Sequence, residues 1–136
     1  MTPRLRSVVL DTTDARALAE FYRQLLDLEY RPGDAPPSDG QPDPRGADWL
    51  VLRNDDGVDL AFQQVEDLPR STWPGTDVPQ QLHLDTSVPD AAALTAARDR
   101  ALELGATQLF DRFDDPDEPL YVLADPAGHP FCIFVG

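Results

Sequence analysis

The feature that most constrains the fold is an internal duplication, because the chain carries nearly the same order of elements twice. The first copy has strands expected at residues 5–12, 28–31, 49–53 and 58–65. The second copy has strands expected at residues 82–88, 107–113, 120–124 and 129–135. After the first strand of each copy comes a helix, with Asp14 or Asp90 as its N-cap. Each half is therefore predicted to be a β-α-β-β-β module.

A four-stranded sheet with one helix covers only one of its faces, so its other face must be buried or enclose something. Two modules side by side solve this problem by enclosing a cleft. We therefore expect one α+β domain over residues 1–136, with a curved mixed sheet around a cleft and the helices outside. Module one is expected at about 4–65, a connector at 66–80 and module two at about 81–136.

Two other patterns refine this picture. Residues 32–47 contain five prolines and three glycines, which predicts a long surface loop that is either mobile or functional, such as a lid. The stripe Leu94, Ala97, Ala101, Leu102 and Leu104 predicts the buried face of the second helix, and Gly105 its end.

Charge and composition limit the partners. The chain has 25 acidic and 11 basic residues, a formal net charge of −14, so nucleic acid and anionic membrane surfaces are disfavoured as partners. Neutral or cationic small molecules are easier partners, although the simpler explanation of the charge is surface acidity that only maintains solubility. No run approaches the ~18 apolar residues of a membrane helix. The single cysteine, Cys132, excludes an internal disulfide framework and fits the cytoplasm.

The residues also resemble a known family. DARALAEFYRQLLDLEY (14–30) resembles a helix of the vicinal oxygen chelate superfamily, which includes glyoxalases, bleomycin-resistance proteins and extradiol dioxygenases. LHLDTSVPD (82–90) and VLADPAGHPFCIF (122–134) resemble its second module, and the combination is similar to its glyoxalase-like domain group. Asp27 departs from the pattern, because glycine usually ends the first helix there. The resemblance implies paired modules, a cleft and a homodimer.

Members of this superfamily typically bind a divalent metal through one ligand on each of four strands. The resemblance carries these positions onto Ser7, Ala61, His83 and Cys132. Only His83 keeps the expected type, and a catalytic zinc normally has three protein ligands. Asp11 and Asp85 share strand parity with these positions and are possible substitutes. We therefore expect no cofactor and no divalent metal; if a metal binds, His83 and Cys132 are its expected ligands.

Alternation along the strands then predicts which side chains line the cleft. The expected ligand-binding set is Ser7, Val9, Asp11, Trp49, Ala61, Gln63, His83, Asp85, Cys132 and Phe134. His83 and Asp85 are the catalytic candidates, because a carboxylate beside a histidine suits acid–base chemistry. The alternative is that His83 is a packed sheet residue and Asp85 a surface group. Trp73 either covers a ligand or packs on a second subunit.

Three functions remain open on these observations. The first is a metal-independent binder of a small cationic or aromatic molecule, such as a protein that sequesters an antibiotic. The second is a lyase, isomerase or dioxygenase-type enzyme, with a rearranged metal site or with His83 and Asp85 as acid and base. The third is a catalytically silent domain that acts through dimerisation.

Overall fold

A computed structural model describes all residues from Met1 to Gly136. The chain divides into two compact units, Met1–Leu68 (unit 1) and Pro69–Gly136 (unit 2), and each contains one module. The connector from residue 69 onward belongs to unit 2.

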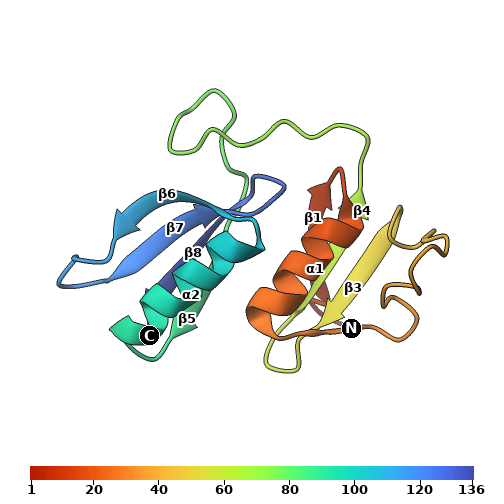
Figure 1. The fold of residues 1–136 in the computed structure, drawn as a ribbon, viewed down its shortest axis with the longest axis horizontal. Coiled ribbons are helices and arrows are strands. Elements are labelled where there is room, and N and C mark those ends of the chain that lie inside the picture. The colour runs from red at the N-terminus through yellow and green to blue at the C-terminus, as the bar shows by residue number, and fades with distance from the viewer. The chain divides into compact units, whose positions relative to one another are not determined.

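Unit 1 holds one helix on a four-stranded sheet (Figure 1). Its elements are β1 (Ser7–Thr12), α1 (Ala15–Leu26), β2 (Glu29–Tyr30), β3 (Trp49–Arg53) and β4 (Asp59–Gln64). The strand order is β1-β4-β3-β2, with β1 parallel to β4 and the other pairs antiparallel. The sheet is therefore mixed, as the predicted module requires.

Unit 2 repeats this topology. Its elements are β5 (Leu84–Val88), α2 (Ala91–Leu104), β6 (Thr107–Arg112), β7 (Leu120–Ala124) and β8 (Pro130–Val135). The order is β5-β8-β7-β6, with β5 parallel to β8 and the other pairs antiparallel. The expected α+β class and the two repeated β-α-β-β-β modules are confirmed.

The helix ends follow local chemistry. Asp14 accepts a hydrogen bond from Ala17 N at 3.0 Å, and Asp90 accepts one from Ala93 N at 2.8 Å, so both predicted N-caps are confirmed. Gly105 ends α2 in the left-handed region at φ 116°. Asp27 ends α1 in the same region at φ 52°, so this aspartate adopts the conformation that glycine usually supplies there.

Each helix packs on one face of its own sheet. Leu18 and Tyr22 of α1 and Leu94 of α2 are fully buried. The prediction that Leu102 belongs to the buried face of α2 was wrong, because its side chain is 39% exposed. At 100° per residue Ala101 falls in line with Leu94, whereas Leu102 falls one step beyond it. With 12 and 14 residues, neither α1 nor α2 has the length and apolar character of a membrane-crossing helix.

The loop of residues 32–47 is tied to unit 1 at two aspartates. The fully buried Asp34 accepts hydrogen bonds from Arg45 at 2.7 Å and from Val51 N at 2.9 Å, and it forms an ion pair with Arg31 at 3.0 Å. Asp43 receives a bidentate pair of hydrogen bonds from Arg16 of α1, at 2.8 and 2.9 Å. These contacts fix much of the loop against the helix and sheet.

Candidate functional site

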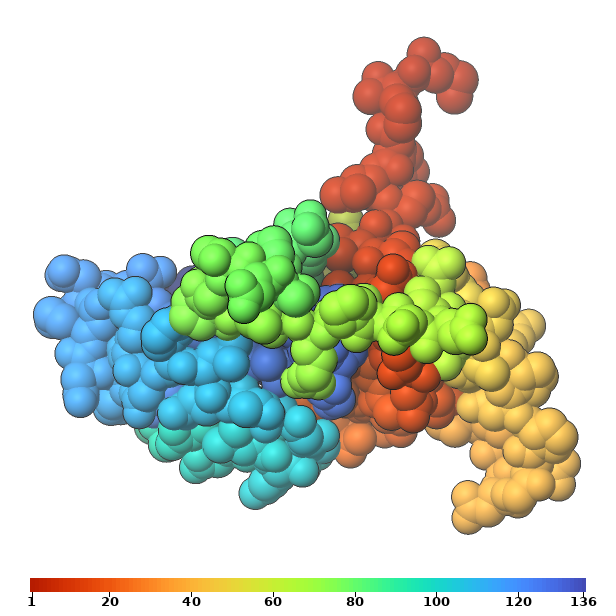
Figure 2. All heavy atoms as spheres, turned by 90° about the horizontal axis from the view of Figure 1, so that it is seen from above, coloured from red at the N-terminus to blue at the C-terminus, as the bar shows by residue number.

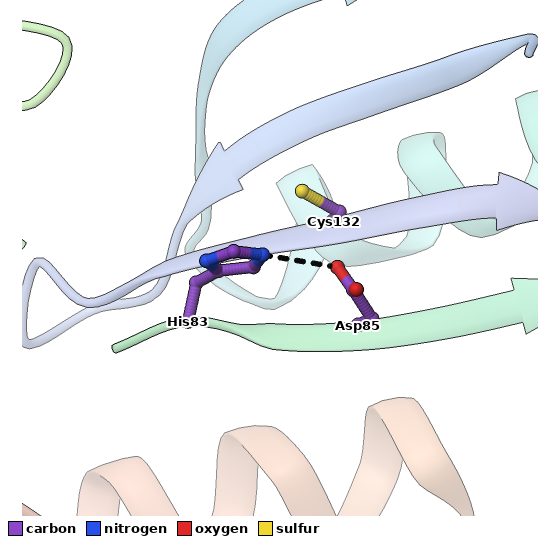
Figure 3. A group of neighbouring side chains, drawn as sticks. All are labelled: His83, Asp85 and Cys132. Carbon is purple, nitrogen blue, oxygen red and sulfur yellow. Dashed lines mark ion pairs between the residues drawn. The ribbon is translucent and has the colours of Figure 1, made fainter.

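The most chemically distinctive cluster in the molecule is formed by His83, Asp85 and Cys132 in unit 2 (Figure 3). The parallel register of β5 and β8 places Asp85 opposite Cys132. His83 lies just before β5 and two residues from Asp85, so both side chains emerge on the same face. His83 Nε2 lies 3.3 Å from Asp85 Oδ1, and the three potential ligand atoms lie within 4.8 Å of one another.

The cluster lines a pocket of about 300 Å³, which we call the unit 2 pocket. Its floor is apolar, because the antiparallel register places Val122 opposite Cys132 and Leu120 opposite Phe134. Phe131 and Ile133, which alternate with these residues along β8, are buried. The pocket therefore lies on the face of β8 opposite to its buried side chains. Its complete lining is Trp73, Gln80, His83, Asp85, Arg112, Glu118, Leu120, Val122, Pro130, Cys132 and Phe134.

Trp73 supplies an aromatic wall from the connector. Its ring packs edge-on against Phe110 of β6, with the ring centroids 5.8 Å apart. In Figure 2 the green connector segment lies against the light-blue segment that contains β6. Trp73 lies in a loop of the connector, residues 72–78, that two hydrogen bonds close. Thr72 N–H donates to Val78 O at 2.7 Å, and Thr72 Oγ1 accepts from Val78 N at 2.9 Å. Trp73 is thus held at the pocket, although it lies outside any strand.

The charges in the unit 2 pocket are mostly acidic. Asp85 has His83 beside it, whereas Glu118 forms no ion pair. The one guanidinium, Arg112, forms an ion pair with Asp115 at 2.9 Å. Burial, and then the negative charge of Asp85, raises the pKa of the Cys132 thiol to about 11. Cys132 is therefore a protonated, weakly nucleophilic thiol at neutral pH.

One buried polar atom in this pocket has no partner. The side-chain oxygen Oε1 of Gln80 is inaccessible to solvent and accepts no hydrogen bond. Leaving a buried acceptor unpaired costs about 1–3 kcal/mol, so such atoms are rare and call for an explanation. A bound molecule with an N–H or O–H group would satisfy it once the Gln80 side chain turns toward the pocket.

The donor set also bears on metal binding. A histidine nitrogen, a carboxylate oxygen and a cysteine sulfur are all zinc ligands, and three of them match the protein ligand number of a catalytic zinc site. His83, Asp85 and Cys132 therefore fit a zinc ion in type and number. Asp85 adds a third potential ligand to His83 and Cys132, which were predicted from the sequence. In unit 1 the positions that the resemblance assigns to ligands do not fit, because Ala61 has no donor and is fully buried.

The other sequence-predicted residues lie in unit 1. Ser7 and Trp49 line a separate pocket there. Val9 of β1 is 37% exposed and stands opposite Ala61, while Asp11 stands opposite the exposed Gln63 of β4. A cleft between the two modules stays a prediction.

Sequence reasoning brought together His83, Asp85, Cys132 and Phe134, and the structure places all four in the unit 2 pocket. Trp73 was named as a residue that either covers a ligand or packs on a second subunit, and it lines this pocket. The lining residues absent from the prediction are Gln80, Arg112, Glu118, Leu120, Val122 and Pro130. Leu120 and Val122 could have been predicted from the sequence, because alternation places them on one face of the 120–124 strand. Gln80 and Glu118 lie in irregular segments, where the sequence carries no periodic signal.

Comparisons with known proteins agree with this architecture. A family model described as "Glyoxalase-like domain" matches residues 7–134. Among solved structures, a glyoxalase/bleomycin resistance protein/dioxygenase family enzyme from Burkholderia phytofirmans PsJN is 16% identical, with a TM-score of 0.68 and 98% of each chain covered. The fosfomycin resistance protein FosX from Mesorhizobium loti is 15% identical, with a TM-score of 0.67, over 100% of this chain and 94% of that one.

A possible glyoxalase from Bacillus cereus is 14% identical, with a TM-score of 0.65 over 98% of this chain and 99% of that one. At these identities the likeness shows a shared fold. No curated protein sequence matches the chain.

Proposed function

This chain belongs to the family of glyoxalase-like domains, and on that premise we propose that it binds a small cationic aromatic molecule in the unit 2 pocket without the help of a metal ion. The role we propose is sequestration of such a molecule, for example an amine-bearing antibiotic. The names of similar structures, which include resistance proteins, suggest this role without assigning it. The unpaired Gln80 Oε1 is the observation that carries the proposal.

A protonated amine satisfies the polar groups of the pocket. Its N–H groups would donate to Gln80 Oε1, which has no partner in the protein, once this side chain turns toward the pocket. Its positive charge is favoured near Asp85 and Glu118, and the net charge of −14 attracts cations at longer range. The Cys132 thiol stays neutral at physiological pH, so the negative charge of the pocket comes from Asp85 and Glu118. An ammonium group therefore supplies both the hydrogen-bond donor that Gln80 lacks and the positive charge that the two carboxylates favour.

An aromatic or aliphatic body suits the rest of the pocket. Leu120, Val122 and Phe134 form the apolar floor, and the Trp73 ring stands at its side. Ligand pockets commonly combine apolar walls with a few fixed polar groups. Near Trp73 a cation also gains from the electron-rich face of the indole ring.

A second candidate function is zinc-dependent catalysis, favoured by the three donor atoms within 4.8 Å. His83, Asp85 and Cys132 would hold the ion, and a bound zinc would polarise a substrate oxygen as a Lewis acid. The high pKa of Cys132 opposes this arrangement at neutral pH, because zinc binds the thiolate and must displace its proton. Calorimetric titration with zinc tests it, and submicromolar binding that His83→Ala and Cys132→Ser both abolish would favour the second candidate.

The binding proposal is tested by calorimetric titration with three probes of similar size. Benzylammonium carries a charge and N–H donors, benzyltrimethylammonium carries the charge alone, and benzyl alcohol is neutral. We expect benzylammonium to bind best, because only it satisfies both Gln80 and the carboxylates. Equal affinity for benzylammonium and benzyl alcohol, or no saturable binding of benzylammonium, would contradict the proposal.

Two charge-matched variants locate the site. Asp85→Asn removes a carboxylate from the pocket and should weaken benzylammonium binding about tenfold, which corresponds to about 1.4 kcal/mol. Glu103→Gln removes the same charge from an exposed position on α2 and should leave the affinity within about twofold. An equal effect of both changes would mean that only the overall charge attracts the probe.

The proposal extends to location and assembly. A cytoplasmic location accords with Cys132, which is a free thiol. A homodimer is expected from the family resemblance, and light scattering of the purified protein measures it.

A further inference from the structure

We propose that a second pocket, which lies wholly within unit 1, binds the doubly charged oxyanion of a small phosphate or phosphonate compound. This unit 1 pocket has a volume of about 400 Å³. It lies along β3, beside the starts of β1 and β4. Arg6, Arg31 and Arg53 line it, although the chain as a whole is strongly acidic.

Two of these arginines lack a partner of opposite charge. Of the 11 basic residues, all of them arginines, seven form ion pairs with carboxylates. Arg6 and Arg53 form none and face the same pocket, despite the 25 acidic residues of the chain. A guanidinium is charged at every physiological pH and matches phosphate oxygens with a planar fork of donors. Two such groups at one pocket match an anion that carries two charges.

The backbone fixes both positions. The carbonyl of Arg6 accepts a hydrogen bond from Asp59 N at 3.2 Å, which ties the residue before β1 to β4. Arg53 is the last residue of β3 and stands opposite Glu29 of β2. The third guanidinium, Arg31, is held by the buried Asp34. The site therefore rests on the sheet and not on a free chain end.

Two acidic residues, Asp59 and Asp55, also line the unit 1 pocket and affect how well it can bind an anion. Asp59 Oδ1 accepts a hydrogen bond from Asn54 N at 3.0 Å, so this carboxylate is engaged in the hairpin turn. Asp55 is exposed, lines the pocket and has no ion-pair partner, so it opposes a bound anion. Removing the charge of Asp55 should therefore strengthen anion binding, an effect opposite in sign to the loss of Arg6 or Arg53.

The wall beside the arginines is apolar. Trp49 and Val51 alternate with Arg53 on one face of β3, and all three line the pocket. A flat hydrocarbon group attached to the oxyanion would pack on them. Phenylphosphonate combines both features, inorganic phosphate carries the charged group alone, and benzoate carries one charge instead of two.

Calorimetric titration of the whole protein with these three probes tests the proposal, at a pH where phenylphosphonate is doubly ionised. Phenylphosphonate should bind more tightly than phosphate or benzoate. Arg6→Gln and Arg53→Gln should each weaken its binding about tenfold. Arg4→Gln, which removes an equally unpaired arginine outside the pocket, should leave it within about twofold. Asp55→Asn should tighten it.

No saturable binding of phenylphosphonate would overturn the proposal. So would an equal loss in Arg4→Gln and Arg6→Gln, or an unchanged or weaker affinity in Asp55→Asn. Asp85→Asn reports on the unit 2 pocket and should not change phenylphosphonate binding. The two proposals can therefore fail independently.

Discussion

Units 1 and 2 share one topology, yet equivalent positions on their paired parallel strands carry different chemistry. In unit 1 the parallel pair β1–β4 places Val9 opposite Ala61. In unit 2 the equivalent pair β5–β8 places Asp85 opposite Cys132. One register position is therefore apolar in one copy and polar in the other. The charges of the two pockets also differ, with the unpaired guanidinium groups of Arg6 and Arg53 in unit 1 and the carboxylates of Asp85 and Glu118 in unit 2.

This contrast separates what builds the fold from what serves a ligand. The helix-facing positions are apolar in both copies, with Leu50 and Phe62 buried in unit 1 and Phe131 and Ile133 buried in unit 2. The positions on the open face are free to change, because the packing between helix and sheet does not depend on them. Function therefore has to be argued from the open faces.

The largest expected effect tests a buried ion-pair network that helps stabilise unit 1. Asp34→Ala removes the acceptor for Arg45 and for the buried Val51 N–H. We expect the free energy of unfolding to fall by about 2–4 kcal/mol, because a buried donor is left unpaired and a charge network is broken. Urea denaturation measures it. Asp39→Ala, in the same loop but exposed, should change little, and equal losses would show that Asp34 has no special role.

The next effect has opposite signs for stability and binding. Gln80→Leu removes the unpaired buried oxygen of the unit 2 pocket, so the ligand-free protein should melt roughly 2–4 °C higher. The same change should weaken benzylammonium binding. Differential scanning calorimetry and titration measure the two quantities. Gln63→Leu, at an exposed position in unit 1, should change neither, and a lower melting temperature for Gln80→Leu would contradict this interpretation.

A smaller effect concerns the thiol of unit 2. The rate of alkylation of Cys132 by iodoacetamide should rise with pH to a midpoint near the pKa of about 11. Asp85→Asn should lower that midpoint, because it removes a negative charge that disfavours the thiolate. The midpoint should still lie above the ordinary cysteine value, since burial is the larger cause. A midpoint in the wild type near that of free cysteine would show that the thiol is more exposed than described.

The smallest effect concerns the loop of unit 1. The guanidinium of Arg16 holds the pKa of Asp43 below its usual range, so the unfolded state binds this proton more readily than the folded state. The resulting stabilisation is complete above the ordinary carboxyl pKa and is lost as the pH falls below it. Asp43→Asn should therefore cost up to about 1 kcal/mol at neutral pH and less in acid. Urea denaturation across this pH range measures it, and a cost that grows in acid would contradict the assignment.

The sequence was sufficient for the fold because the fold depends on repeated, periodic features. The caps Asp14 and Asp90 and the alternating strands follow local rules, and both were found correctly. Leu102 shows the limit of that reasoning, because an apolar residue one step off the helical stripe was assigned to the core and is exposed. Apolar character alone does not decide the face; the angular position does.

The site was harder to predict for a physical reason. Alternation placed His83, Asp85, Cys132 and Phe134 on one face, because they lie on or beside regular strands. The side-chain oxygen of Gln80 is buried although Gln80 lies in the irregular connector, where no local pattern predicts burial. The unpaired arginines of the unit 1 pocket likewise stand out only once every ion pair in the structure has been assigned.

We propose that the unit 2 pocket binds an ammonium ligand without a metal ion. The most direct test is to titrate benzylammonium into protein freed of metal by a chelator, and again after addition of one equivalent of zinc. We expect the same saturable binding to the metal-free protein as to the protein before chelation, and no gain with zinc. Binding that disappears on chelation and returns with zinc would contradict it and assign His83, Asp85 and Cys132 to a metal centre.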